Sequence, residues 1–497
     1  MNTTLKNLDV TRREVSNSIN REKKSALGQF FTPSPIAEFM SSLFCLPDKE
    51  EISILDPGAG IGSLSVALIQ KLSENSQYRT IHWTGYEIDD TLLHNLKAHL
   101  KNAEKSLLKN KIELHSNFIN ADFLIDSVRH IQSNKRPIYD FAIINPPYKK
   151  ILSDSYHRKI LSSVKIETVN LYTAFITLSL ELLKPGGQLV AIIPRSFCNG
   201  PYYKSFRKYL ITNTSFKRIH SFVSRDKAFK DDDVLQENII IHLEKQGIQG
   251  NVEISISEDS SFNNMKELIF PFEMIVKSQD SEQFIHIPTS TKTYPRSYQT
   301  TFSYSLYDLG LSVSTGPIVD FRSSKITTSN YEKDCIPLLY PFNFGILEIN
   351  WPIRGKKHNG VVYDENGKNQ LFTRGFYVVT RRFSSKEENR RVYANVVNPD
   401  KFTSDYFTFE NHLNVFHIYK NGLKKEIAYG LAIYLNSTYL DQQFRQFSGH
   451  TQVNVTDLKL LKYPSAYKLE NIGKWAITQE NITQENIDKE ILNNAIQ

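Results

Sequence analysis

Residues 52–62 read ISILDPGAGIG, and this stretch decides the fold class. The apolar run Ile52–Leu55 is typical of a buried strand, and the residues after the stretch have the spacing of a helix. Between them lie Asp56, Gly58 and Gly60, where glycine lets the backbone turn sharply and approach a ligand closely. The stretch therefore predicts a strand, a ligand-binding turn and a helix in succession, a unit that also binds NAD and FAD in other proteins.

The same alternation of strand and helix continues through the first half of the chain. Apolar runs predict strands at Ile52–Leu55, Ile81–Tyr86, Ile112–His115, Tyr139–Ile144, Gln188–Ile193 and Asn238–His242. Helical spacing occurs at about Leu64–Leu72, Thr91–Ala103, Leu171–Leu183 and Tyr202–Leu210. Such alternation predicts an α/β, Rossmann-like domain with a parallel sheet covered on both faces, whose ligands bind at the carboxyl ends of the strands.

The chain is too long for one compact core, so we expect several domains. The alternation stops near Gly250, and the rest is irregular and rich in Tyr, Phe, Asn and Ser, which predicts a mixed α+β second domain. The expected division is an N-terminal arm at 1–25, a catalytic domain at 26–248, a second domain at 249–466 and a polar tail or peripheral helix at 467–497. Within the second domain, Lys425–Phe447 has a helical pattern.

Composition restricts the protein class. Hydrophobic residues make up 40% and charged residues 23% of the 497 residues, as in a soluble globular protein. No apolar run approaches the ~20 residues of a membrane span, so we expect a cytoplasmic protein without a membrane partner. The three scattered cysteines indicate neither disulfides nor a metal site. The net charge of +7 is compatible with a polyanionic partner.

Acidic residues follow the second and third predicted strands. Glu87 ends the strand Ile81–Tyr86, where a carboxylate can accept hydrogen bonds from both hydroxyls of a ribose. Asp122 and Phe123 follow the third strand and suit an adenine amino group and ring. Together with the turn at 56–60, these strand ends offer groups suited to an adenosine. The alternative is that the acids only cap the helices that follow.

The turn Asn145-Pro146-Pro147-Tyr148 comes directly after the apolar strand Phe141–Ile144. An exocyclic amine is a poor nucleophile because its lone pair is delocalised into the ring. The Asn145 side-chain oxygen and the Pro146 carbonyl can each accept one amine hydrogen, which directs the lone pair at an electrophilic methyl group. Tyr148 offers a ring face for a stacked base. The alternative is an ordinary proline turn that packs a tyrosine.

In these motifs the chain resembles the amino-group DNA methyltransferases, in the γ order that places cofactor motifs before the catalytic motif and the target-recognition domain. The resemblance implies S-adenosyl-L-methionine as cofactor and transfer of its methyl group to N6 of an adenine flipped out of duplex DNA. It carries cofactor-binding roles over to Thr32, Pro33, Asp56, Gly58, Gly60, Glu87, Ile88, Asp122, Phe123 and Asn145. It implies catalytic roles for Asn145, Pro146 and Tyr148, and base stacking by Tyr148 and Phe229.

The second domain carries the predicted DNA contacts. Residues 354–391 contain ten Lys or Arg against four Asp or Glu, interleaved with aromatic residues. Such a stretch can hold phosphates, although a solvated basic face has the same composition. The predicted DNA-binding residues are Arg354, Lys356, Lys357, Arg381, Arg382, Arg390, Arg391 and His450. Segments 314–322 and 447–454 resemble type II modification enzymes of the PstI and BsuBI kind, which implies a separate restriction endonuclease as partner.

Rival interpretations remain open on the sequence. RNA and protein-glutamine N-methyltransferases use the same Asn-Pro-Pro-aromatic turn, and cytosine N4 is a rival target within DNA. A catalytically silent DNA-binding subunit is a third possibility, although every position that the chemistry requires is filled. The recognised DNA sequence and the oligomeric state do not follow from the sequence.

Overall fold

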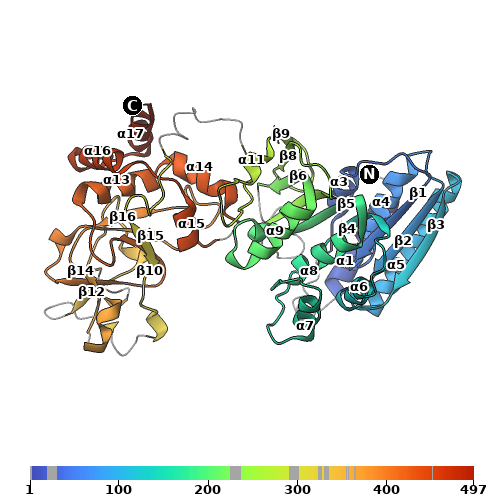
Figure 1. The fold of residues 1–497 in the computed structure, drawn as a ribbon, viewed down its shortest axis with the longest axis horizontal. Coiled ribbons are helices and arrows are strands. Elements are labelled where there is room, and N and C mark those ends of the chain that lie inside the picture. Colours follow the sequence, from blue (N-terminus) through green and yellow to red (C-terminus); the bar gives the residue numbers. More distant parts are fainter. Residues whose placement is uncertain are drawn as a thin grey trace. The chain divides into compact units, whose positions relative to one another are not determined.

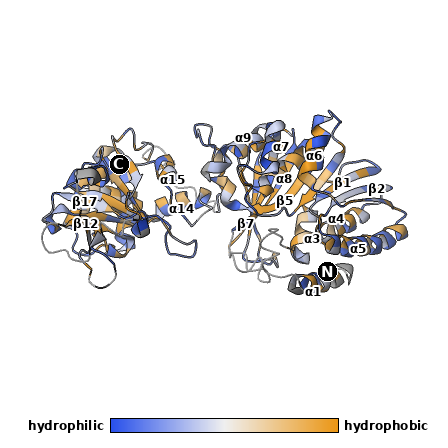
Figure 2. Cartoon of the chain, turned by 90° about the horizontal axis from the view of Figure 1, so that it is seen from below, coloured by the Kyte–Doolittle hydropathy of each residue, from blue (hydrophilic) through white to orange (hydrophobic). Residues whose placement is uncertain are grey.

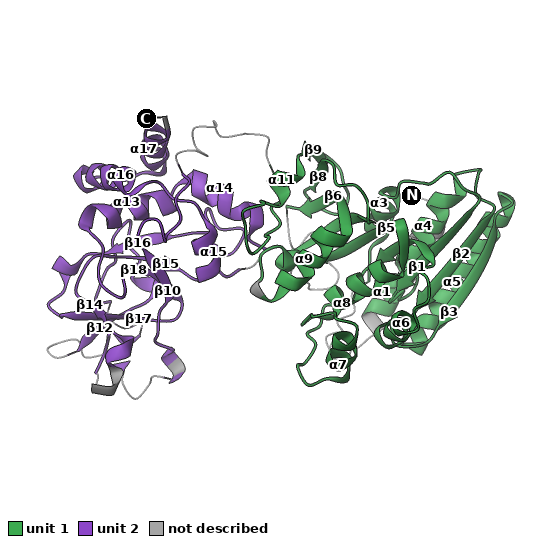
Figure 3. Cartoon of the chain, in the orientation of Figure 1, with its two compact units in different colours: residues 1–291 green, residues 292–497 purple. Residues whose placement is uncertain are grey.

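The computed structural model describes residues 3–18, 31–223, 237–289, 302–322, 327–328, 335–353, 355, 357–362, 365–449 and 451–496. Four predicted site residues lie outside these ranges: Phe229, Arg354, Lys356 and His450. The chain forms two compact units, Met1–Thr291 and Lys292–Gln497 (Figure 3). Each unit is described by itself.

A nine-stranded sheet forms the centre of the first unit, in the order β3-β2-β1-β4-β5-β7-β6-β8-β9 (Figure 1). The strands are β1 Glu51–Pro57, β2 Thr80–Tyr86, β3 Glu113–Ile119, β4 Tyr139–Ile144, β5 Leu183–Pro194, β6 Thr214–Phe222, β7 Asn238–Lys245, β8 Val252–Ser257 and β9 Lys266–Phe270. Strands β1 to β5 are parallel, whereas β7 is antiparallel to both of its neighbours. All six predicted strands are therefore present, and the α/β prediction is confirmed. The sheet is mixed and not parallel throughout as expected, because β7 and β9 run antiparallel to their neighbours. The chain reverses direction across the sheet between β1 and β4, which opens a crevice at the carboxyl ends.

Helices cover both faces of this sheet because successive strand residues point to opposite sides. In β4, Phe141 and Ile143 belong to one buried cluster, and Ala142 and Ile144 to the other. The first face carries α1 Thr3–Ser18, α3 Ser34–Ser42, α4 Ser63–Ser73 and α5 Asp90–Lys109. The second face carries α6 Phe123–Gln132, α7 Tyr156–Ser163, α8 Leu171–Leu182 and α9 Lys204–Asn213, and the short α11 Phe272–Ile275 follows the sheet. Figure 2 shows hydrophobic residues concentrated along the central strands, as two covered faces require.

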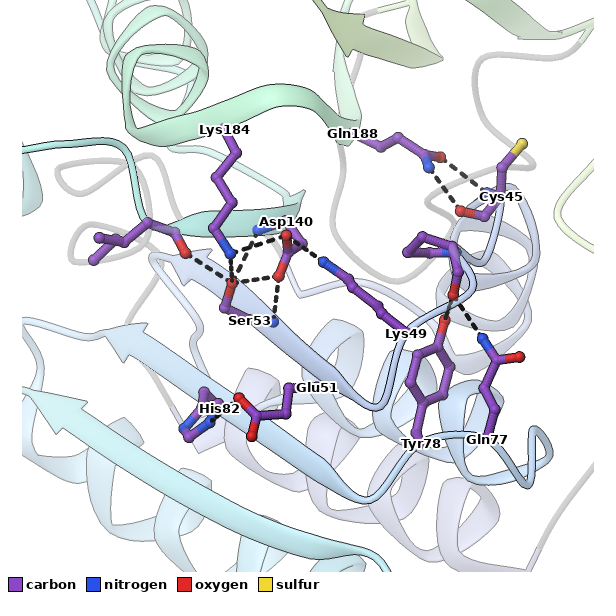
Figure 4. A network of polar contacts seen from close by, with 12 residues as sticks. Cys45, Lys49, Glu51, Ser53, Gln77, Tyr78, His82, Asp140, Lys184 and Gln188 are labelled. Atoms are coloured by element: carbon purple, nitrogen blue, oxygen red, sulfur yellow. Dashed lines mark hydrogen bonds and ion pairs between the residues drawn. The ribbon is translucent and has the colours of Figure 1, made fainter.

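A polar network at the amino end of the sheet joins β1, β4 and β5 (Figure 4). Asp140 accepts hydrogen bonds from the backbone N and Oγ of Ser53, at 2.8 and 2.6 Å. Its other carboxylate oxygen pairs with Lys49 at 2.5 Å and Lys184 at 3.1 Å. Burial alone would raise the pKa of Asp140, but the hydrogen bonds from Lys49, Ser53 and Lys184 outweigh it and lower the pKa. The network therefore stabilises the register of the strands that carry the functional turns.

Two of the predicted boundaries of the first domain differ from the structure. Part of the expected arm at 1–25 is the helix α1, which packs against α3 and α4. Its buried face, Leu8, Arg12 and Ser16, repeats every four residues, a helical spacing that polar side chains obscure in the sequence. The sheet also continues past the expected boundary at 248, because β8 and β9 pair with it.

The second unit contains two smaller sheets. One has the order β10-β18-β15-β16 and is antiparallel; the other has the order β11-β13-β12-β17-β14. Their strands are β10 Ser312–Thr315, β11 Thr327–Thr328, β12 Ile336–Leu339, β13 Gly360–Val361, β14 Phe372–Thr373, β15 Tyr377–Arg381, β16 Ala394–Val397, β17 Tyr406–Phe409 and β18 Leu413–His417. The helices are α13 Lys425–Leu435, α14 Thr438–Phe447, α15 Val455–Leu460, α16 Ala466–Thr478 and α17 Gln484–Ile496.

The helices of the second unit correct two details of the prediction. The single helical pattern at Lys425–Phe447 is two helices, α13 and α14, because Ser437 caps the second one through its side chain. The expected polar tail at 467–497 is α16 and α17, which bury Ile472, Ile487 and Ile491. Of the two expectations for this segment, the peripheral helix is therefore correct, in the form of two helices.

Helices α13 and α16 cross in close contact through two glycines. A Cβ atom on Gly473 would lie 1.8 Å from the carbonyl oxygen of Glu426, and one on Gly430 would lie 1.9 Å from that of Leu469. These neighbours are backbone atoms, so a side chain forces the helices apart. The absence of side chains at 430 and 473 therefore determines how α16 docks.

We expect Gly473→Ala to lower the free energy of unfolding of the second unit by ~1–3 kcal/mol, although alanine stabilises an isolated helix relative to glycine. Differential scanning calorimetry of the full chain measures the effect as a lower unfolding temperature. Gly250→Ala is the matched control, because a Cβ atom there meets nothing within 4 Å. An unchanged transition in Gly473→Ala would show that the helix contact is not tight.

Candidate active site

A cavity of about 390 Å³ opens at the carboxyl ends of β1 to β4. Seven predicted cofactor residues line it: Gly58, Gly60, Glu87, Ile88, Asp122, Phe123 and Asn145. Further lining comes from Phe31, Tyr86, Leu92, Ala121, Leu124, Pro147, Lys149, Lys150, Ile151, Leu152, Ser155, His157, Leu171 and Phe175. The fold thus gathers residues from four strand ends into one pocket.

The glycine turn after β1 is held against the end of β2. The backbone N–H groups of Gly58 and Ala59 both donate to the carbonyl of Tyr86, at 2.9 and 2.8 Å. Gly58 and Gly60 have φ angles of 75° and 59°, in the region that favours glycine. Side chains at these positions would be strained and would fill the pocket, so the turn suits close approach of a ligand.

Asp56 lies under this turn and is almost completely buried. The Ser65 hydroxyl donates to its Oδ2, and its Oδ1 has no hydrogen-bond partner among the described residues. Burial raises the pKa of Asp56 to about 7, the negative charge of Glu87 adds to the rise, and the Ser65 hydrogen bond opposes it. A buried carboxylate with an unsatisfied oxygen favours a cationic ligand nearby.

Glu87 connects two elements of the pocket. Its Oε2 accepts a hydrogen bond from the Gly60 backbone N at 2.8 Å, and its Oε1 accepts one from the Asp89 backbone N at 2.8 Å. Burial raises the pKa of Glu87, while these backbone hydrogen bonds lower it again in part. The carboxylate is thereby fixed at the cavity wall, where its remaining lone pairs can accept from hydroxyl groups.

The two carboxylate oxygens of Asp122 have different partners. Its Oδ1 accepts from the backbone N of Leu124 at 2.9 Å and of Ile125 at 3.3 Å, so it caps helix α6. Its Oδ2 lies 2.7 Å from Nε2 of His157. Asp122 therefore caps helix α6, the alternative role that the sequence left open, and it also lines the cavity. Phe123 next to it packs its ring 5.1 Å from that of Phe175.

The Asn145 side chain lies between two hydroxyl groups. Its Nδ2 donates to Oγ1 of Thr32 at 3.0 Å, and its Oδ1 accepts from the Tyr148 hydroxyl at 3.1 Å. The Tyr148 hydroxyl is also 3.0 Å from the carbonyl of Ile192. These contacts fix the orientation of the amide at the edge of the cavity.

Five residues of the predicted cofactor and catalytic site do not line the cavity, and one of them is Asp56 under the glycine turn. Thr32 is buried against Asn145, and Pro33 is the residue that precedes α3. Pro146 is buried, and the Tyr148 ring is half-buried and meets the Tyr172 ring edge-on at 6.3 Å. Thr32 and Tyr148 contact the Asn145 side chain and so hold it in place.

Sequence reasoning missed the wall formed by residues 149–157. Lys149, Lys150 and His157 line the cavity but lie in the loop and helix after the catalytic turn. No strand ends there, so the rule that located the other residues gave no signal. The one local signal is Ser155, whose side chain caps α7.

The described basic residues predicted to bind DNA are either at least partly exposed or buried. The exposed group consists of Lys357, Arg381, Arg382 and Arg390. Lys357 pairs with Asp320 at 2.6 Å, and the Arg381 guanidinium lies 3.8 Å from the centre of the Tyr393 ring. Arg381 and Arg390 line a cavity of about 450 Å³ together with Tyr393. Arg382 donates to the carbonyl of Asn411 at 3.2 Å and is partly exposed.

Arg391 differs from these residues because its side chain is buried. Only 1% of the residue is exposed, and its Nε donates to Oγ of Ser384 at 3.1 Å. Its guanidinium also lies 5.5 Å from the centre of the Phe444 ring, on α14. Counting charges cannot separate a buried arginine from a surface one, so the expected DNA contact at Arg391 is corrected to a role in packing.

The described residues contain neither a membrane-spanning helix nor a cluster of metal ligands. None of their helices has the length and apolar character needed to cross a membrane. Nowhere in the same part of the chain do three or more His, Cys, Asp or Glu side chains gather as ligands for a metal ion.

The groups at the pocket suit S-adenosylmethionine in their chemistry. Its glycine turn leaves room for a ligand against the backbone, and its buried Glu87 offers acceptors for hydroxyl groups. Asp56, buried beneath this turn, has a carboxylate oxygen without a hydrogen-bond partner among the described residues, which favours a cation nearby. An enzyme with this sheet order and this pocket at the carboxyl edge is an S-adenosylmethionine-dependent methyltransferase.

Comparisons with known proteins identify the family. Residues 39–229 match the Eco57I restriction-modification methylase family. The chain is 46% identical over 469 residues to the type II methyltransferase M.BsuBI of Bacillus subtilis, covering 93% of this chain and 92% of that protein. It is 40% identical over 495 residues to the type II methyltransferase M.PstI of Providencia stuartii, covering 99% and 97%. The chain therefore belongs to the type II DNA methyltransferases of restriction-modification systems.

A solved structure has the same overall fold in both halves. The type IIL restriction-modification enzyme MmeI, determined in complex with DNA, aligns with a TM-score of 0.55 and 13% identity. The alignment covers 99% of this chain and 72% of that one. The shared fold agrees with the predicted α/β domain followed by a mixed domain.

We expect the elevated pKa of Asp56 to make the stability of the ligand-free protein depend on pH. The folded carboxyl keeps its proton up to about pH 7, whereas the unfolded one loses it near pH ~4. Its stabilising contribution is therefore complete below pH ~4 and is lost as the pH rises through about 7. Between about pH 5 and about pH 7.5, the unfolding temperature of wild type should fall more than that of Asp56→Asn. Each kcal/mol of stability that wild type loses through Asp56 corresponds to a further fall of ~2–4 °C.

Asp140→Asn is the control with the opposite sign. The lowered pKa of Asp140 means that its carboxylate stabilises the fold above the unfolded pKa, so this variant should unfold at a lower temperature at neutral pH. Parallel pH profiles for wild type and Asp56→Asn would show that Asp56 is ionised throughout.

Proposed function

We propose that this enzyme methylates N6 of adenine in duplex DNA and that Asn145 activates the amine. The observation that supports the proposal is the amide of Asn145, held by two hydroxyl groups at the mouth of a pocket suited to the cofactor. The type II relatives and the match to a methylase family argue against RNA and protein substrates. Adenine is favoured over cytosine because the turn has asparagine at its first position.

The protein's contribution to catalysis is geometric and electrostatic. Asn145 Oδ1 and the Pro146 carbonyl accept the two amine hydrogens, which makes the nitrogen pyramidal and aims its lone pair. Thr32 and Tyr148 prevent the amide from turning, so no reorganisation is needed when the base arrives. The bound cofactor supplies an electrophilic methyl group on a sulfonium. The surplus proton on N6 leaves afterwards, and we assign no general base.

The target adenine must leave the helix to reach Asn145, at a cost of a few kcal/mol for unpairing and unstacking. We propose that the Tyr148 ring stacks on the extruded base. Phe229, the second predicted stacking residue, lies outside the described residues and stays a prediction. A stacked aromatic ring is worth ~1–3 kcal/mol for each base, which offsets part of the cost.

The second unit is the proposed DNA-recognition domain. Among its described basic residues, Lys357, Arg381, Arg382 and Arg390 are partly or fully exposed and keep their proposed role at phosphates or base edges. Membership in the type II family supports a separate restriction endonuclease as functional partner, with DNA in the cytoplasm as the shared substrate.

We expect Asn145→Ala to lower kcat by at least ~100-fold while cofactor affinity stays within a few-fold of wild type. Nucleoside analysis of treated duplex DNA measures 6-methyladenine, and calorimetry with S-adenosylhomocysteine measures binding. Tyr148→Phe is the control, since it keeps the ring and removes only the hydroxyl, with its contacts to Asn145 and to the carbonyl of Ile192. Near-normal turnover by Asn145→Ala, or 4-methylcytosine as the product, would overturn the proposal.

We expect the double variant Arg381→Ala/Arg382→Ala to bind duplex DNA more weakly and with a flatter salt dependence, because a protein that neutralises two phosphates fewer releases fewer counterions. The slope of log affinity against log salt should fall by about 1 for each phosphate that is no longer neutralised. Arg79→Ala/Arg136→Ala is a control with the same charge change, since both of its exposed arginines precede strands, at the amino edge of the sheet. Identical slopes for both variants would remove this segment from the interface.

A further inference from the structure

His157 is a residue of the pocket to which neither the sequence motifs nor the proposed chemistry assigns a role. It is the second residue of α7, and its Nε2 lies 2.7 Å from Oδ2 of Asp122. Both side chains line the cavity, with 35% and 25% of their surfaces exposed. The imidazole therefore lies in the pocket wall and contacts the carboxylate proposed for the adenine of the cofactor.

The two carboxylate oxygens of Asp122 have different partners. The backbone N–H groups of Leu124 and Ile125 hold Oδ1 at the start of α6, which leaves Oδ2 to contact the ligand. A carboxylate held only through hydrogen bonds to one oxygen can still tilt about that oxygen, which moves the other one. The bond from His157 to Oδ2 removes that freedom, while a second lone pair on Oδ2 remains to accept from an amino group.

We propose that His157 is a positioning residue for cofactor recognition: it turns Asp122 so that Oδ2 meets the amino group of the adenine ring. The inference rests on the proposed contact between Asp122 and that amino group. It assigns to α7 a part in selecting adenosine over related nucleosides. If the hydrogen bond from His157 only connected α6 to α7, its loss would leave the preference for adenosine unchanged.

Electrostatics favour a protonated imidazole in this position. The hydrogen bond and charge of Asp122 raise the pKa of His157, and burial opposes the rise. In turn, burial would raise the pKa of Asp122, but the contact with His157 outweighs it and lowers the pKa. The amino end of a helix disfavours a cation, so the charge on His157 depends on Asp122.

Other charged groups around the pair are Glu87, Lys149 and Lys150 in the cavity wall, and Arg158 and Asp126 on the two helices. Arg158 pairs with Glu167 at 2.9 Å, and Asp126 accepts from the Tyr86 hydroxyl at 2.7 Å. Asp122 is therefore the carboxylate that holds His157. As the pH rises through the raised pKa of His157, the charge-assisted bond becomes a weaker neutral one, and cofactor affinity should fall.

The first test compares ligands. Calorimetry on the full-length protein measures binding of S-adenosylhomocysteine and of S-inosylhomocysteine, which has an oxygen in place of the amino group. Wild type should prefer the adenosyl ligand, and His157→Ala should lose about tenfold of that preference. Equal weakening of both ligands, with the preference unchanged, would mean that His157 only docks α7 and would overturn the proposal.

The second test uses pH. Between about pH 6 and about pH 8.5, the ratio of the dissociation constants of His157→Gln and wild type for S-adenosylhomocysteine should fall about fivefold. The ratio removes the effect of groups common to both proteins, such as Asp56. His130→Gln on α6 is the matched control, since its partly exposed ring lies outside the cavity lining, with Nε2 3.4 Å from the backbone carbonyl of Arg136. A constant ratio would contradict the proposal.

These tests are independent of the methylated atom. Because both measure binding, they give a result even if the enzyme forms no 6-methyladenine, in which case the proposed function fails alone. If wild type binds the two nucleosides equally, Asp122 does not contact the amino group, and the inference fails while methyl transfer to adenine still stands.

Discussion

Parallel pairing of β1 with β2 is the constraint on which the site depends. The pairing runs in register from Glu51 opposite Thr80 to Pro57 opposite Tyr86, and it continues beyond the strands. The N–H groups of Gly58 and Ala59 both bond to the carbonyl of Tyr86, so the glycine turn starts where the ladder ends. One residue of slip would reverse the faces of the strand and move this turn away from Glu87. Asp140, at the opposite edge, joins β1 to β4 through Ser53.

The buried charges of the pocket favour a cationic ligand. Asp56 and Glu87 are both buried, and in both cases burial raises the pKa. Each makes ionisation of the other less favourable, and Asp56 has a carboxylate oxygen without a hydrogen-bond partner among the described residues. A cation placed there offsets the unfavourable burial of both groups at once. Part of the affinity for a positively charged cofactor therefore comes from relief of this electrostatic strain.

Sequence reasoning located the site where it depends on strand ends and failed where it depends on packing. Glu87 and Asp122 follow apolar runs, and parallel strands bring such positions to one edge whatever the loops between them do. His157 follows no strand, so only the fold brings it to Asp122. Arg391 shows the same limit for charge, because neighbours distant in sequence decide that it is buried. The boundary between the two domains was predicted less well. The sheet continues through β8 and β9 after the alternation of strand and helix has ended. The open edge of a sheet can pair with a further extended segment, so the end of the alternation does not mark the end of the domain.

The contacts of Asn145 show why a catalytic amide needs support outside the pocket. An amide side chain can present either its oxygen or its nitrogen, and only the oxygen can accept an amine hydrogen. Thr32 and Tyr148 distinguish the two ends, since one hydroxyl accepts from Nδ2 and the other donates to Oδ1. The Tyr148 hydroxyl also contacts the carbonyl of Ile192 in β5. The orientation of the catalytic amide is thus tied to the central strands, so the sheet that binds the cofactor also directs the group proposed to activate the substrate.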